Sequence, residues 1–84
     1  MSWDYRVVRR QGNDRYEPTQ FFYGIHEAYY KKTGECFAIT KEPVDVFGDT
    51  PSEVLETLIM MRQACKRPVL DYETREPVED AVQP

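Results

Sequence analysis

The stretch YGIHEAYYKKTGECFAI, from Tyr23 to Ile39, predicts a β-hairpin that forms the centre of the fold. The runs on either side of its central KTG are rich in aromatic and β-branched residues, which favour strands. A three-residue loop that ends in a left-handed glycine, here Gly34, is a common hairpin connection. We therefore expect one strand over about 20–31 and another over about 35–42.

The register of this hairpin decides which side chains face the core. The loop places Lys31 opposite Glu35 as an oppositely charged pair, so odd-numbered residues pair with odd-numbered residues. The odd-numbered face is then the expected core face, and its apolar members are Trp3, Tyr5, Val7, Tyr23, Ile25, Tyr29, Phe37 and Ile39. A loop of two or four residues would shift the register by one and turn the other set inward, which is Phe22, His26, Ala28 and Tyr30.

His26, the only histidine, is followed directly by Glu27, and these two residue types often act together in acid–base catalysis. Neighbouring residues of a strand point to opposite faces, so the two side chains cannot meet in one pocket. In the odd register Glu27 is the one charged member of the core face, where it needs hydrogen-bond partners. We expect it at the sheet margin, reaching water or a tyrosine hydroxyl, and a general base is the alternative.

A helix is expected between Thr50 and Pro68. Thr50 as N-cap, Pro51 at the first helical position and Glu53 at the third make a capping box. Pro68 ends the helix. Apolar residues recur at helical spacing in a stripe that could cover a small sheet: Val54, Leu58, Met61 and Cys65.

The remaining segments complete an α+β fold of the order β-β-β-α-β. Trp3–Arg10 alternates as a first strand, and Val69–Tyr72 is long enough for one edge strand. We expect a three-stranded antiparallel meander with the helix packed on one face. The short fourth edge strand lies parallel to strand 1, in the spatial order 3-2-1-4.

Length and composition indicate one small domain. The chain has 84 residues and a formal net charge of −4, and its 40% hydrophobic and 13% aromatic content is not that of a disordered protein. From Glu73 onward four acidic residues and one basic residue occur, with little apolar surface to bury. We therefore expect a single domain over residues 1–73 and a disordered acidic tail over residues 74–84.

The helix can cover only one face of the sheet, so the sequence predicts that the other face stays open. That face combines aromatic and charged side chains with small residues that let another surface approach. It is the candidate partner-binding face, and its members are Arg6, Arg10, Phe22, His26 and Tyr30. A merely solvated face is the alternative. The same register puts Cys36 and Cys65 on opposite sides of the sheet, which excludes a disulfide between them.

Several classes of function are disfavoured by composition. Two cysteines and one histidine fall short of the four ligands of a structural zinc site, and we expect no metal and no other cofactor. No apolar run is long enough for a membrane span, and no signal-peptide pattern begins the chain, so we expect a cytoplasmic protein with reduced thiols and no membrane partner. The acidic charge balance argues against nucleic acid as a partner.

The segments YGIHEAYY, AITKEPV, FGDTPSEVLETL and KRPVLDYE, within Tyr23–Glu73, resemble a group of short bacterial proteins of unknown function. That resemblance implies a bacterial source and no particular activity. The element order, with GDTPSEVLETL entering the helix, is similar to the antitoxin domain of HicB-type proteins. This second resemblance implies a partial ribonuclease-H-like sheet that binds a small toxin. The loop EPVDVFGD departs from it, since it lacks the proline-glycine-cysteine pattern of such domains.

We therefore expect a small non-catalytic protein-binding module, of the HicB-like antitoxin or regulator type. It would meet a protein partner, or a second copy of itself, through the open sheet face or a sheet edge. A small enzyme that uses His26 or Glu27 and a nucleic-acid-binding protein are the alternatives. The sequence leaves open the partner, the oligomeric state and any small-molecule ligand.

Overall fold

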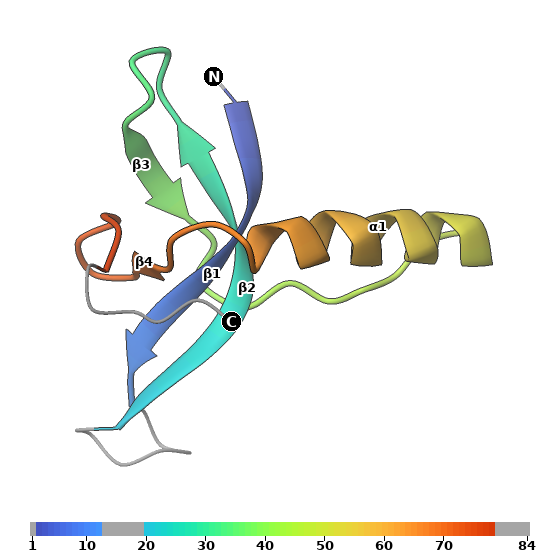
Figure 1. The fold of residues 1–84 in the computed structure, drawn as a ribbon, viewed down its shortest axis with the longest axis horizontal. Helices are drawn as coiled ribbons and strands as arrows, with labels where there is room; N and C mark the ends of the chain where they lie inside the picture. The colour runs from blue at the N-terminus through green and yellow to red at the C-terminus, as the bar shows by residue number, and fades with distance from the viewer. Residues whose placement is uncertain (1, 13–19, 79–84) are drawn as a thin grey trace.

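The computed structural model describes residues 2–12 and 20–78 (Figure 1). Its elements are β1 (Ser2–Gln11), β2 (Phe21–Tyr30), β3 (Cys36–Ile39), α1 (Pro51–Ala64) and β4 (Leu70–Asp71). The strands form one mixed sheet in the order β3-β2-β1-β4, in which β4 runs parallel to β1 and the other pairs are antiparallel. The predicted α+β class, the strand order and the parallel fourth strand are confirmed.

The sheet is curled around a small core. β3 and β4 both lie on one side of the long β1–β2 ribbon, and α1 leaves from the other side (Figure 1). The core inside the curl consists of Val8, Ala28 and Leu70, with Tyr30, Cys36, Ile39 and Tyr72 packed against them. The even-numbered side chains of β1 and β2 therefore point into the curl.

The hairpin loop has the predicted form. The Lys31 amide donates to the Glu35 carbonyl at 2.9 Å, and the two side chains form an ion pair at 3.6 Å. Gly34 has a φ of +93°, the left-handed conformation that favours glycine. The loop therefore sets the odd-with-odd register that was predicted beside it.

A β-bulge then changes that register one residue further on. Tyr30 pairs with Cys36, but Tyr29 pairs with Ala38, so Phe37 is the extra residue. Beyond the bulge odd-numbered residues of β3 pair with even-numbered residues of β2. Ile39 consequently lies opposite Ala28, inside the curl.

The predicted core face is therefore wrong. Trp3 is 46% exposed and Tyr23 is 56% exposed, whereas Val8, His26 and Ala28 are fully buried. The physical reason is the combination of bulge and curl: the bulge turns Ile39 inward, and the curl folds β3 and β4 over the face that was expected to be open.

Helix α1 begins as predicted. The Thr50 hydroxyl accepts a hydrogen bond from the Glu53 amide at 3.2 Å, and Pro51 occupies the first turn. The Glu53 carboxylate accepts a hydrogen bond from the Asp49 amide at 3.2 Å. In a capping box the donor is the amide of the N-cap residue, here Thr50, so the observed donor lies one residue earlier. The helix ends at Ala64, earlier than Pro68, which was the expected limit.

The helix does not lie across the sheet. Its C-terminal end meets β1, and its N-terminal end points away from the sheet (Figure 1). The predicted packing on one face holds at the C-terminal end, where Met61 and Ala64 are buried. The predicted stripe is wrong as a cover for the sheet, because Leu58 and Cys65 are exposed.

The chain remains hydrogen-bonded beyond the predicted domain boundary at Glu73. The Asp71 amide donates to the Glu76 carbonyl at 2.9 Å, and the Val78 amide donates to the Val69 carbonyl at 2.7 Å. Arg75, which has a φ of +61°, lies in the turn that these two hydrogen bonds close. The structure thus extends the domain to Val78, and residues 79–84 of the expected tail lie outside the described residues.

Candidate functional site

The predicted partner-binding face is mostly enclosed. Arg6 is 5% exposed and His26 is fully buried, so neither side chain can meet a partner surface. Arg10, Phe22 and Tyr30 are half-buried. The expectation of an open face is wrong because the curl covers it, and partner binding by the three half-buried members remains a prediction.

Arg6 is held inside the curl by hydrogen bonds. One terminal nitrogen donates to the Tyr30 hydroxyl at 3.1 Å, and the other donates to the Pro68 carbonyl at 2.6 Å. The Tyr30 hydroxyl in turn donates to an Asp4 carboxylate oxygen at 2.6 Å. Burial raises the pKa of Tyr30, and the hydrogen bond to Asp4 raises it further. The guanidinium thus ties β1 to β2 and to the segment that enters β4.

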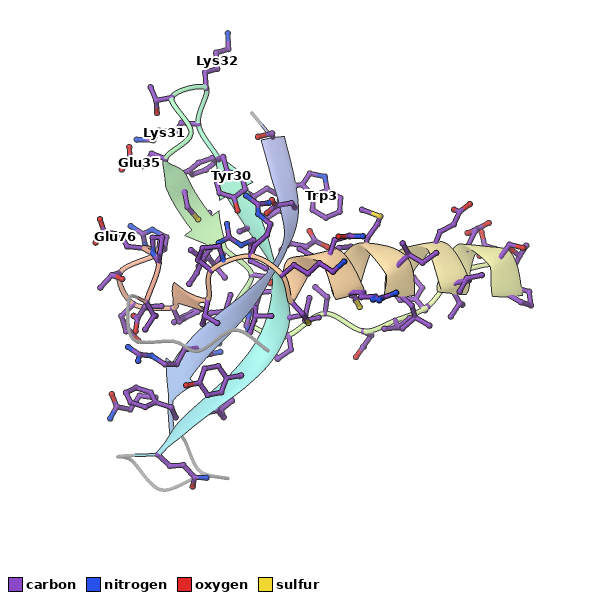
Figure 2. All side chains as sticks on the ribbon, viewed as in Figure 1. Trp3, Tyr30, Lys31, Lys32, Glu35 and Glu76 are labelled. Carbon is purple, nitrogen blue, oxygen red and sulfur yellow. The ribbon has the colours of Figure 1, made fainter. Side chains whose placement is uncertain are left out.

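A cleft of about 300 Å³ lies beside this network. The residues that line it include Arg6, Tyr30, Cys36 and Arg75. Glu35 from the β2–β3 hairpin and Glu76 from the turn after β4 add two carboxylates (Figure 2). Residues of both charge signs therefore line the cleft.

His26 links β2 to the end of β3. Its Nδ1 lies 2.8 Å from the Thr40 carbonyl oxygen, to which it donates, and its ring lies 6.2 Å from the ring of Tyr72. Burial lowers the pKa of His26, so the imidazole is neutral near pH 7. Its Nε2 is buried without a hydrogen-bond partner among the described residues. The buried ring therefore links β2 to the residue that follows β3.

Glu27 lies on the opposite side of the sheet from His26. Its carboxylate accepts a hydrogen bond from the Tyr29 hydroxyl, and this bond raises the pKa of Tyr29. The prediction that Glu27 reaches a tyrosine hydroxyl is confirmed. His26 and Glu27 thus face different surroundings, as strand alternation predicted.

The other arginines of β1 also have partners within the chain. Arg9 forms an ion pair with Asp71 at 2.9 Å, and its guanidinium lies 4.2 Å from the centre of the Phe21 ring. Arg10 donates to the Lys41 carbonyl, and its guanidinium lies 4.0 Å from the centre of the Tyr72 ring. These contacts fix the arginines as cross-links of the sheet, which reduces the charge available to a phosphate backbone.

Besides exposed side chains of the sheet such as Trp3 and Tyr23, exposed apolar side chains lie on an arm that consists of residues 45–50 and α1. The preceding residues of the connection still pair with β2, as the 2.9 Å hydrogen bond from the Val44 amide to the Ile25 carbonyl shows. Phe47 is 78% exposed, and three helix residues are about half exposed: Leu55 at 58%, Leu58 at 47% and Ile59 at 51%. Leu55, Leu58 and Ile59 follow helical spacing on one side of α1, and we call them the helix face. The buried side of the same helix carries Met61 and Ala64.

Sequence reasoning missed the helix face, although a signal for it was present. The apolar residues of α1 occupy two sides of the helix: Val54 and Met61 on one, and Leu55 and Ile59 on the other. A helix that buries a single stripe against a sheet needs only one of these sides. The second apolar side therefore indicates a second contact.

Comparisons with known proteins find no similar family, curated protein or solved structure. The resemblances to a short bacterial family and to HicB-type domains remain predictions. Across residues 2–12 and 20–78, no helix combines the length and the apolar character needed to span a bilayer. Within the same residues, no three metal-binding side chains of the His, Cys, Asp and Glu types gather at one place.

Proposed function

We propose that this protein is a small non-catalytic binding module that contacts a protein partner through the helix face of its arm. One observation carries the proposal: Leu55, Leu58 and Ile59 form a continuous apolar side on a helix that projects from the sheet. Scattered exposed leucines are ordinary on a protein surface, whereas a row at helical spacing is typical of an interface.

The marginal stability of such a helix supports this function. α1 has 14 residues, and isolated helices of this length are only marginally stable in water. Two of its residues, Met61 and Ala64, are buried in the chain, so intramolecular packing stabilises mainly its C-terminal half. A partner on the helix face would stabilise the N-terminal half as well.

The finer proposal is a regulator or antitoxin of the HicB type, whose partner would be a small protein. It is supported by the element order and by the capped helix that follows the hairpin. In this proposal the arm replaces the open sheet face as the contact surface, because the sheet face is enclosed.

The test compares two substitutions of similar exposure on different sides of α1. Leu58→Ser removes a residue of the helix face, and Met60→Ser, at 49% exposure, is the matched control on another side. Binding of the purified chain, either to itself or to a partner identified by mass spectrometry, should be lost in Leu58→Ser and kept in Met60→Ser. Equal binding by both variants would contradict the proposal.

A further inference from the structure

The buried guanidinium of Arg6 has no carboxylate partner among the described residues. Arg6 is 5% exposed, and its terminal nitrogens donate to two uncharged groups, the Tyr30 hydroxyl and the Pro68 carbonyl. Its Nε is buried without a hydrogen-bond partner in the part of the chain that the structure describes. An arginine stays charged at any ordinary pH, so it cannot avoid the cost of burial by losing its proton. Buried charges are usually paired, and Arg6 therefore lacks the counterion that such a charge ordinarily has.

Arg6 lines the cleft of about 300 Å³ that also contacts the β2–β3 hairpin and the turn after β4. This volume is within the range of small-molecule sites. Arg75 lines the same cleft, and it forms no ion pair with any residue in the described ranges 2–12 and 20–78. The fold thus brings two arginines without ion-pair partners, one from β1 and one from the turn after β4, to a single cavity.

The acidic residues near the cleft do not balance both arginines. Glu35 forms an ion pair with Lys31 at 3.6 Å, so its charge is already matched. The Asp4 carboxylate, which accepts from the tyrosine hydroxyl of the same network, is matched by Arg67. Glu76 is the other lining carboxylate, and it has no ion-pair partner among the described residues. Two unmatched arginines and one unmatched carboxylate leave one excess positive charge at the cleft.

The turn that carries Arg75 is fixed by bonds within the chain. The Asp71 carboxylate accepts from the amides of Glu73 at 2.9 Å and Thr74 at 3.2 Å, and the Asp71 carbonyl accepts from the Arg75 amide at 2.7 Å. The same carboxylate pairs with Arg9 of β1 at 2.9 Å, which anchors the turn to the sheet. A ligand in the cleft does not have to order this segment, and this lowers the free-energy cost of binding.

We propose that this cleft binds a small oxyanion, a carboxylate or a phosphate group, on Arg6 and Arg75. A planar guanidinium presents paired N–H donors that match two oxygens of such a group. Binding supplies the buried Arg6 with its missing counterion. The single excess charge matches one carboxylate more closely than a phosphate group, which carries between one and two negative charges near pH 7. The site is separate from the helix face, so the two proposals stand or fall independently.

The first test titrates the isotope-labelled full chain with sodium acetate and, separately, with sodium phosphate near pH 7, and follows the amide signals by NMR. Sodium chloride at equal ionic strength is the reference. Amide signals of the residues that line the cleft should shift and reach saturation with an oxyanion, namely those of Gly34, Glu35, Cys36, Thr74, Arg75 and Glu76. The anion with the lower dissociation constant identifies which oxyanion group the site prefers. Shifts with both anions no larger than those with chloride overturn the proposal.

The second test removes the arginines of the cleft. Arg75→Gln changes an exposed residue and should raise the dissociation constant of the better anion about tenfold or more. Arg62→Gln on α1, also exposed, is the matched control and should leave it unchanged. Arg6→Lys keeps the buried charge but loses the paired donors, so it should weaken binding as well, and its spectrum shows whether the sheet is intact. An unchanged dissociation constant in Arg75→Gln would contradict the proposal whatever Arg6→Lys does.

The third test checks that excess positive charge attracts the anion. Glu76→Gln removes the unmatched carboxylate of the cleft and should lower the dissociation constant about two- to fivefold, because a repelling charge is lost. Glu56→Gln on α1 makes the same change of charge away from the cleft and should have no effect. Weaker binding in Glu76→Gln would contradict a site that selects its ligand by positive charge.

Discussion

The curled sheet buries polar side chains, whereas the arm exposes apolar ones. Inside the sheet the largest fully buried side chains are His26 and Val8, and Arg6, which pairs with His26 across the two strands, is 5% exposed. On the arm, Leu55 and Leu58 face solvent instead. The difference shows that a polar network around a small apolar core holds the sheet together. The apolar side chains of the arm are not used in this core and remain exposed to solvent.

The comparison is tested most strongly by removing a leucine from each region. Leu70→Ala, in the core at 2% exposure, should reduce the free energy of unfolding by about 2–5 kcal/mol through a cavity. Leu58→Ala should cost about 1 kcal/mol or less, because that side chain is half exposed. Urea unfolding at a protein concentration too low for self-association measures both. Equal costs would mean that the arm belongs to the core.

A second pair of substitutions removes an arginine from each region. Arg6→Met takes away a buried guanidinium and leaves the Pro68 carbonyl without its donor, which should cost about 1–3 kcal/mol. Arg62→Met on the exposed side of α1 is the control and should change stability by about 0.5 kcal/mol or less. If Arg6→Met stabilises the protein, the buried guanidinium is retained for a reason other than stability, as some buried ions are.

The parts of the fold that the sequence could predict are those with a local signature. Gly34 marks the hairpin loop, and Thr50 with Glu53 marks the start of the helix. The bulge at Phe37 has no such signature, because any residue can occupy it and tertiary packing selects it. One extra residue there was enough to place Ile39 on the other face of the sheet, and the curl of the sheet then buried that face.

The candidate site was missed for a related reason. Both sides of α1 are apolar, and periodicity alone does not say which side meets the sheet. The predicted stripe correctly contained Met61, which is buried, but it also contained Leu58, which is half exposed, and it left out Ala64, the other buried residue. The distinction depends on the angle at which the arm leaves the sheet, which only the three-dimensional structure gives.

A change of pH should affect the sheet and leave the arm unchanged. Burial lowers the pKa of His26 below its unfolded value of 6.5. As the pH falls below 6.5, the unfolded chain therefore binds a proton at His26 before the folded chain does. His26 therefore does not reduce the free energy of unfolding above pH 6.5, and it reduces this free energy increasingly as the pH falls below 6.5. His26→Gln should flatten the dependence of the urea midpoint on pH between about 7.5 and 5.5. An unchanged slope in the variant would show that His26 is not its source.

The smallest expected effect concerns the cap of the arm. Thr50→Ala removes the hydroxyl that accepts from the Glu53 amide, at a cost of about 1 kcal/mol, while Thr50→Ser keeps the hydroxyl and serves as the control. Because α1 meets the sheet only at its C-terminal end, this loss should be confined to the arm. Hydrogen exchange should become faster for amides of α1 and stay unchanged for amides of β1 and β2. Faster exchange in both regions would mean that the arm and the sheet open as one cooperative unit, and the contrast between them would then be one of exposure alone.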